Sequence, residues 1–150
     1  MADASNAPIL QRLKTVGLRP TRQRVALAGL LFRAGDRHVT AEQLHQEALS
    51  ERVRVSLATV YNTLHQFTDA GLLREVVVEA GRSYFDTNVS DHHHFFLVDS
   101  GSLLNIASDR VGVASLPDAL RGTSVERVDV IIRLRKQPAG APARSKAPRA

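Results

Sequence analysis

The order of local patterns in residues 7–87 constrains the fold of this chain more than any other feature. Apolar residues recur at helical spacing in four short segments, and each segment is bounded by residues that start or end helices. Two strand-like segments follow, joined by a turn at Ala80-Gly81. The helical segments are 7–16, 20–34, 40–50 and 56–70, and the strands are 73–79 and 82–87.

Within this order, three helices followed by a hairpin are the arrangement of a winged helix, which is a helix-turn-helix with an attached β-ribbon. The sequence therefore predicts an α+β fold, with a winged-helix domain at residues 1–88. Small three-helix units also serve as protein-interaction modules, so the topology alone leaves the partner open.

The fourth helical segment favours DNA as that partner. Its polar face carries small, hydroxyl and amide side chains, with no acidic residue before Asp69. Such side chains at a helix N-terminus can approach phosphates and base edges. Asn62 can pair with adenine, and Tyr61 can pack against a thymine methyl, although Tyr61 also suits a half-buried packing position. The candidate DNA-binding residues here are Ser56, Thr59, Tyr61, Asn62 and His65.

Positive charge is concentrated in two places. The formal net charge is +5, of which residues 136–150 carry +4, so the rest of the chain has about +1. Residues 137–150 are rich in Pro, Ala and Gly and are predicted to be a disordered basic tail. Residues 12–37 carry seven basic residues against Asp36 alone, which indicates either a basic DNA-facing surface or ordinary solvated helix faces. The candidate DNA contacts here are Arg19, Thr21 and Arg22.

Residues 91–135 predict a second, smaller unit. A strand at 95–98 turns at 99–101 and returns at 103–106, a helical turn is expected near 116–120, and a well-buried strand is expected at 125–134. Three strands and one helical turn make too small a core to be stable alone. Pairing with a second copy would complete the core and would place two recognition helices on successive major-groove turns.

Three consecutive histidines precede this unit's first strand, in a chain that has no cysteine. Alternate side chains of a strand share a face, so His92 and His94 point one way and His93 the other. Imidazole and carboxylate ligands suit Fe, Mn, Zn or Cu, or an axial bond to haem iron, and they exclude a thiolate zinc site. The alternative is a solvated polar strand end.

Four stretches of this sequence resemble the Fur family of transcriptional regulators. They are 18–24, 38–42, 55–61 with Leu64 and Phe67, and 83–86. The resemblance covers about residues 10–135, and the histidine triplet without cysteines is most similar to the haem-responsive Irr branch. It implies a homodimeric, iron- or haem-responsive regulator in the cytoplasm that binds palindromic AT-rich operators. It also implies a small C-terminal α/β dimerisation domain at 89–136.

The resemblance further implies a hinge site for Fe²⁺ or Mn²⁺. Its ligands would be His38, Asp86, His92 and His94, while Asn105 stands where the family has a further acid. The family's structural zinc site needs a CxxC pair, which this chain lacks.

Within the Irr branch the histidine cluster is tied to haem. The resemblance therefore implies haem, including haem delivered by ferrochelatase, on His92, His93 and His94. Two alternatives remain. Asp86 is also similar to the peroxide-sensing, PerR-like branch, which Asn105 disfavours. A catalytic metal centre is disfavoured because the sequence carries no phosphate loop, nucleophile motif or second acid pair, and no membrane segment is expected.

Overall fold

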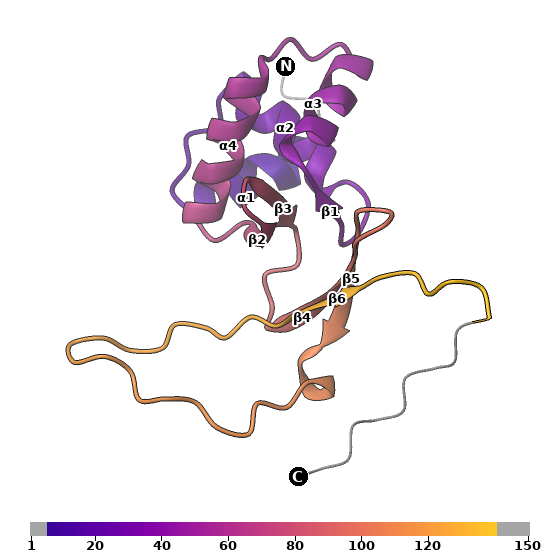
Figure 1. Cartoon of the computed structure of the whole chain (residues 1–150). Coiled ribbons are helices and arrows are strands. Elements are labelled where there is room, and N and C mark those ends of the chain that lie inside the picture. Colours follow the sequence, from indigo (N-terminus) through magenta and orange to yellow (C-terminus); the bar gives the residue numbers. More distant parts are fainter. Residues whose placement is uncertain (1–5, 141–150) are drawn as a thin grey trace. The chain divides into compact units, whose positions relative to one another are not determined.

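The structure is a computed structural model that describes residues 6–140. The chain divides into two compact units, Met1–Ser90 and Asp91–Ala150, each with its own small sheet (Figure 1). The first unit contains helices and a sheet and the second is built on strands, which confirms the predicted α+β class.

Four α-helices form most of the first unit, close to the expected positions. Thr21, Thr40 and Ser56 each precede a helix in extended conformation and accept a backbone N–H of its first turn, which satisfies a donor that the helix leaves unpaired. Gly71, at φ 83°, follows the end of the last helix, as predicted. The helices are α1 (Ala7–Thr15), α2 (Arg22–Phe32), α3 (Ala41–Ser50) and α4 (Leu57–Asp69).

The sheet of the first unit contains the predicted hairpin and one further strand. β2 (Arg74–Glu79) pairs antiparallel with β3 (Arg82–Asp86), and β3 pairs on its other side with β1 (His38–Val39). The sequence did not indicate a strand at 38–39, because two residues are too few to show an alternating pattern. β1 matters for function, because it places His38 directly opposite Asp86.

The core of the first unit gathers side chains from all four helices and the hairpin. Leu27, Leu31, Leu64 and Phe67 are fully buried, as the helical spacing predicted. Leu49, one residue before the end of α3, lies outside this core, with its side chain 50% exposed.

The second unit is a three-stranded sheet in the order β5-β4-β6. β4 (His92–Leu97) is central, β5 (Ser102–Ala107) returns antiparallel to it, and β6 (Ile131–Leu134) joins its other edge in parallel. A parallel neighbour needs a long crossover, and here residues 108–130 supply it with only one short 3₁₀ helix, η2 (Ser108–Arg110).

Two expectations for this unit are wrong. Residues 116–120 form no helical turn, and the strand predicted at 125–134 exists only at 131–134. That strand is also not well buried, because Ile132 and Leu134 are 37% and 41% exposed. β6 is an edge strand of a single sheet. Its apolar side chains therefore do not pack against a second layer in the described part of this unit.

The sheet of the second unit has two chemically different faces. Directly paired residues of neighbouring strands share a face, and Phe95 of β4 lies opposite both Leu104 and Ile132. With Leu97 and Leu134, two residues further along, these side chains make a partly exposed apolar face. His92 and His94 occupy the opposite face of the same sheet.

The C-terminal segment is only partly described. Residues 137–140 are exposed and contain no helix or strand, and residues 141–150 of the predicted basic tail lie outside the described residues. No helix in the described part is long and apolar enough to cross a membrane.

Candidate metal ligands and nucleic-acid interface

Two of the four predicted metal ligands meet inside the first unit. β1 and β3 pair so that His38 faces Asp86, and His38 Nε2 lies 3.0 Å from Asp86 Oδ2. Two ligand atoms on one tetrahedral Zn²⁺ ion, with bonds near 2.0–2.1 Å, would be roughly 3.3 Å apart. The pair lies at hydrogen-bond distance, slightly closer than two ligands of one ion would be.

Asp86 is fully buried, and its second oxygen is also engaged. Oδ1 accepts the backbone N–H of Asn88 at 2.9 Å, and the Asn88 side-chain oxygen accepts the N–H of Ser90 at 3.0 Å. Arg74 Nη1 donates to the Ser90 carbonyl at 3.2 Å. These bonds tie residues 86–90 to the hairpin. We did not predict them, although Asp and Asn two residues apart are a known signal for such turns.

The other two ligands meet inside the second unit. His92 and His94 are both buried, and their ring centroids are 4.5 Å apart with an interplanar angle of 62°. This confirms that they share one face of β4. His94 pairs across the sheet with Asn105, the position where an acid was expected from the resemblance.

His93 behaves differently from its neighbours. Its Nδ1 accepts the backbone N–H of Val130 at 3.1 Å, which fastens β4 to the segment entering β6. In the neutral ring the proton then sits on Nε2, so neither nitrogen offers an uncommitted lone pair. This bond disfavours the predicted role of His93 as a haem ligand and gives it a role in holding the sheet together.

The chemistry of these residues fits a divalent transition metal. Together the four residues offer three imidazole nitrogens and one carboxylate. Imidazole suits Fe and Zn, and carboxylate suits Mn, whereas softer thiolate sites are excluded because the chain has no cysteine.

The predicted DNA-binding residues of α4 divide into two kinds. The Ser56 hydroxyl caps the helix by accepting the Thr59 N–H at 3.1 Å, and it donates to the Thr59 hydroxyl at 3.0 Å. Tyr61, Asn62 and His65 are exposed further along the same helix. The first pair therefore shapes the start of α4, and the second group presents functional groups to solvent.

The three candidates before α4 lie at the start of α2. Arg19, Thr21 and Arg22 are exposed. Arg24 joins this segment to α4, because its guanidinium donates to the Arg19 carbonyl at 2.9 Å and to Gln66 Oε1 at 3.0 and 3.2 Å. The predicted basic segment is therefore attached to the helix that carries Tyr61.

Acidic residues approach the polar face of α4 from other elements, which the sequence of α4 alone did not show. The Tyr61 hydroxyl donates to Glu42 Oε1 of α3 at 2.6 Å, and His65 Nδ1 lies 4.0 Å from Glu75 Oε2 of β2. The hydrogen bond from Tyr61 lowers the pKa of the Glu42 carboxyl, and the same bond raises the pKa of Tyr61. Tyr61 is 37% exposed, so its ring is accessible even though its hydroxyl is bonded to Glu42.

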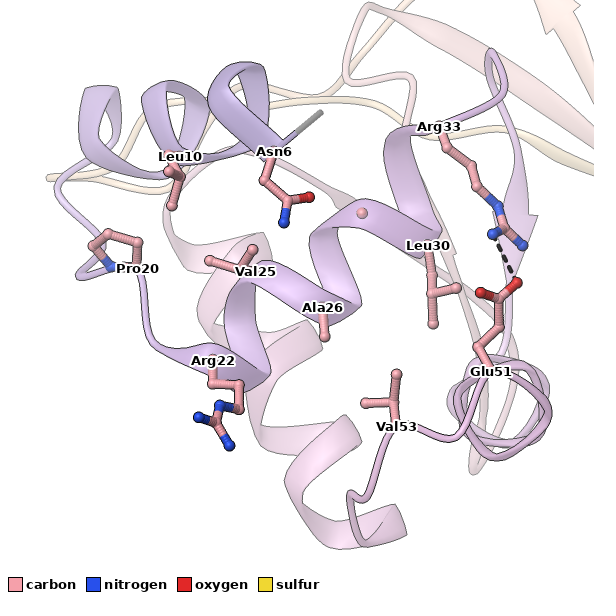
Figure 2. Close-up of a pocket in the computed structure, with 11 residues that line it drawn as sticks. Asn6, Leu10, Pro20, Arg22, Val25, Ala26, Leu30, Arg33, Glu51 and Val53 are labelled. Atoms are coloured by element: carbon pink, nitrogen blue, oxygen red, sulfur yellow. Dashed lines mark hydrogen bonds and ion pairs between the residues drawn. The ribbon is translucent and has the colours of Figure 1, made fainter. Parts of the chain in front are cut away.

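A separate cavity of about 530 Å³ lies beside α1, α2 and the loop after α3 (Figure 2). Its wall is mainly apolar, with Leu10, Val25 and Val53, and the Arg33–Glu51 ion pair of 2.8 Å stands at its edge (Figure 2). Of the predicted site residues only Arg22 lines it. The cavity therefore gathers neither the metal ligands nor the base-facing side chains.

Comparison with known proteins identifies the family. The model of the ferric uptake regulator family matches residues 15–132. The chain is 34% identical to the ferric uptake regulation protein of Shigella flexneri over 100 residues, which are 66% of this chain and 68% of that protein. Against the protein of Escherichia coli K12 the identity is 33%, with the same coverage of both chains.

Solved structures agree with this sequence match. The ferric uptake regulator of Pseudomonas aeruginosa with manganese superimposes with a TM-score of 0.64 at 25% identity, covering 85% of this chain and 97% of that one. The Vibrio cholerae ferric uptake regulator has the same fold, with a TM-score of 0.67 at 22% identity over 85% and 99% of the two chains. The chain belongs to the ferric uptake regulator family of metal-responsive transcriptional regulators.

Proposed function

We propose that this chain is a homodimeric regulator whose binding to palindromic AT-rich DNA depends on a divalent metal held by His38, Asp86, His92 and His94. The observation that carries the proposal is the contact between His38 and Asp86 at 3.0 Å in the first unit, matched by the adjacent rings of His92 and His94 in the second. Each unit therefore supplies two ligands that are already close together.

Regulation follows from the position of these pairs in the chain. Asp86 and His92 stand on either side of the boundary at Ser90. Four ligands around one ion would fix the orientation of the DNA-binding unit relative to the dimerising unit. Because a ligand shifts a conformational equilibrium by its differential affinity for the two states, metal would favour the arrangement that fits the operator. The Pseudomonas aeruginosa relative described with manganese agrees with this class of ion.

The proposal is tested by fluorescence anisotropy of an operator selected from random DNA. Binding is measured with metal-free protein, with Mn²⁺ or Fe²⁺, and after a chelator is added. We expect tight binding only with metal and its reversal by the chelator. Equal binding with and without metal would contradict metal control.

Base recognition is proposed for Tyr61 and Asn62. Tyr61→Ala is expected to weaken specific binding by about 1–3 kcal/mol, because it removes a base-edge contact, while binding to random DNA changes little. Leu120→Ala, on an exposed residue of the second unit, is the control. If Tyr61→Ala binds the operator as the unchanged protein does, α4 is not the reading helix.

Dimerisation is proposed through the apolar face of Phe95, Leu97, Leu104, Ile132 and Leu134. A contiguous exposed apolar face marks an interaction surface, and a charge placed in it would have to be desolvated. Ile132→Asp is therefore expected to weaken the dimer at least about tenfold, as measured by sedimentation equilibrium. Leu120→Asp, in an exposed loop, should leave the dimer unchanged.

Haem binding stays a prediction from the sequence, and the Pseudomonas aeruginosa relative reported above is described with manganese instead. If the triplet binds haem, His92 and His94 should provide the ligands, since the His93 Nδ1 lone pair is engaged with Val130. Haem titration should then give the same Soret band for His93→Ala as for the unchanged protein. His94→Ala should lose the band. No Soret shift in the unchanged protein would exclude the haem-responsive branch.

A further inference from the structure

Glu42 is an acidic side chain at a surface proposed to face DNA, where an uncompensated negative charge opposes phosphate binding. It lies in the first turn of α3. Thr40 and Gln43 hold that turn by bonding each other's backbone N–H groups at 3.1 and 2.9 Å. Glu42 is thus presented from a rigid helix start, and its carboxylate accepts the Tyr61 hydroxyl at 2.6 Å.

The proton in this hydrogen bond stays on the Tyr61 oxygen. The bond lowers the pKa of Glu42 and raises the pKa of Tyr61, so at neutral pH the carboxylate is ionised and the phenol keeps its proton. An ionised carboxylate can only accept hydrogen bonds. The single O–H of Tyr61 therefore points at Glu42 and is not available to a base.

The aromatic ring is held as well. Tyr61 stacks on His65, with ring centroids 6.5 Å apart and planes inclined by 20°. His65 in turn lies edge-on to the buried Phe85 ring at 5.6 Å. These contacts and the bond to Glu42 restrict rotation of the ring, although Tyr61 remains partly exposed.

From this arrangement we infer that Glu42 is a positioning residue that sets base specificity. By accepting the hydrogen bond of the hydroxyl, Glu42 leaves the Tyr61 oxygen to DNA as an acceptor. In the major groove an acceptor matches the amino groups of adenine N6 and cytosine N4, and it is repelled by thymine O4 and guanine O6. Tyr61 then selects an amino-bearing base at one position of each half-site, in addition to any contact of its ring with a thymine methyl. The inference rests on the proposed function, in which α4 reads DNA.

The test selects DNA from a random library with the Mn²⁺-loaded protein and with three variants. Tyr61→Phe removes the hydroxyl, and Glu42→Ala leaves the proton of the Tyr61 hydroxyl free to be donated elsewhere. Glu75→Gln is the matched control. Glu75 lines a surface cavity together with Glu42 and Tyr61 but makes no bond to Tyr61, so this change removes one negative charge from the cavity and leaves the hydroxyl bonded. We expect the first two variants to lose the preference for adenine or cytosine at one half-site position, and Glu75→Gln to keep it.

A base analogue then tests the contact itself. At a selected adenine, purine without the N6 amino group should weaken binding of the unchanged protein about 3- to 10-fold, which is the range for one hydrogen bond. Tyr61→Phe should bind both DNAs equally. Glu42→Ala should tolerate thymine or guanine there, because the released hydroxyl can donate.

Absorbance titration measures the pKa of Tyr61, which can then be compared with the base preference of each variant. A purely structural bond would change the pKa without changing the preference. The chain has two tyrosines and no tryptophan, so tyrosinate formation can be followed directly. In Glu42→Ala the pKa of Tyr61 should fall towards its ordinary value, and Tyr61→Phe assigns the signal.

The possible failures are distinguishable. A protein that enriches no sequence overturns the proposed function. A protein that enriches an operator, with Glu42→Ala and Tyr61→Phe showing its preference at every position, overturns only the role of Glu42. The role of Glu42 is also overturned if Tyr61→Phe still discriminates adenine from purine, because this substitution leaves α3 unchanged.

Discussion

Asp86→Asn is expected to lower the Mn²⁺ affinity of this protein by more than about 100-fold, since groups that merely orient a metal ligand already contribute about 10- to 100-fold. The substitution keeps the size of the side chain and removes the only carboxylate of the proposed ligand set. Asp86 is fully buried beside His38, so no neighbouring solvent-exposed acid can replace it without rearrangement. Metal-dependent DNA binding should be lost with the affinity.

The affinity is measured by Mn²⁺ electron paramagnetic resonance or by calorimetry. Asp118→Asn is the matched control, because it makes the same change of charge at an exposed loop residue of the second unit. Circular dichroism checks that Asp86→Asn is folded. The check is needed because the new amide replaces the carboxylate that accepts the Asn88 N–H. An Asp86→Asn protein that binds Mn²⁺ as the unchanged protein does would show that the ion binds elsewhere.

Leu64→Ala is expected to destabilise the first unit by about 2–5 kcal/mol, the range for truncating a fully buried leucine. Leu64 is 0% exposed and packs in the core from the same helix that carries Tyr61. The loss combines the transfer of buried methyl groups and the cavity left behind. Urea unfolding followed by circular dichroism gives the free energy of unfolding.

Leu49→Ala makes the same chemical change on α3, where the side chain is 50% exposed. It should cost less than about 1 kcal/mol, as expected for a surface substitution. Equal losses for the two variants would contradict the placement of Leu49 outside the core and Leu64 within it.

The elements of the first unit were predictable because their signals are local. Thr40 with Gln43, Ser56 before its helix and Gly71 after it act within a few residues, so the chain specifies these boundaries wherever it folds. The shared face of His92 and His94 is likewise a consequence of strand geometry alone. The role of Ser56 was harder to predict, because a hydroxyl that caps a helix looks the same in a sequence as one that faces DNA.

The second unit was less predictable because its signals depend on pairing. Residues 125–134 alternate at first and then become an apolar run, a pattern that does not distinguish a buried central strand from a short edge strand. The partner across the sheet decides, and β6 pairs on one side only, with β4. The exposed faces of Leu104 and Ile132 follow from that topology.

By itself, the sequence determined the α+β class, the approximate helix boundaries and the absence of a CxxC zinc site, and it limited the candidate metal ligands to histidine and carboxylate side chains. These follow from residue chemistry and spacing along the chain. Only the tertiary structure decided which residues from distant segments meet. β1, two residues long, sets His38 against Asp86, and α3 brings Glu42 to the Tyr61 hydroxyl 19 positions away. Val130 meets the His93 ring across 37 positions. Such contacts depend on packing in three dimensions, for which neighbouring residues carry no signal.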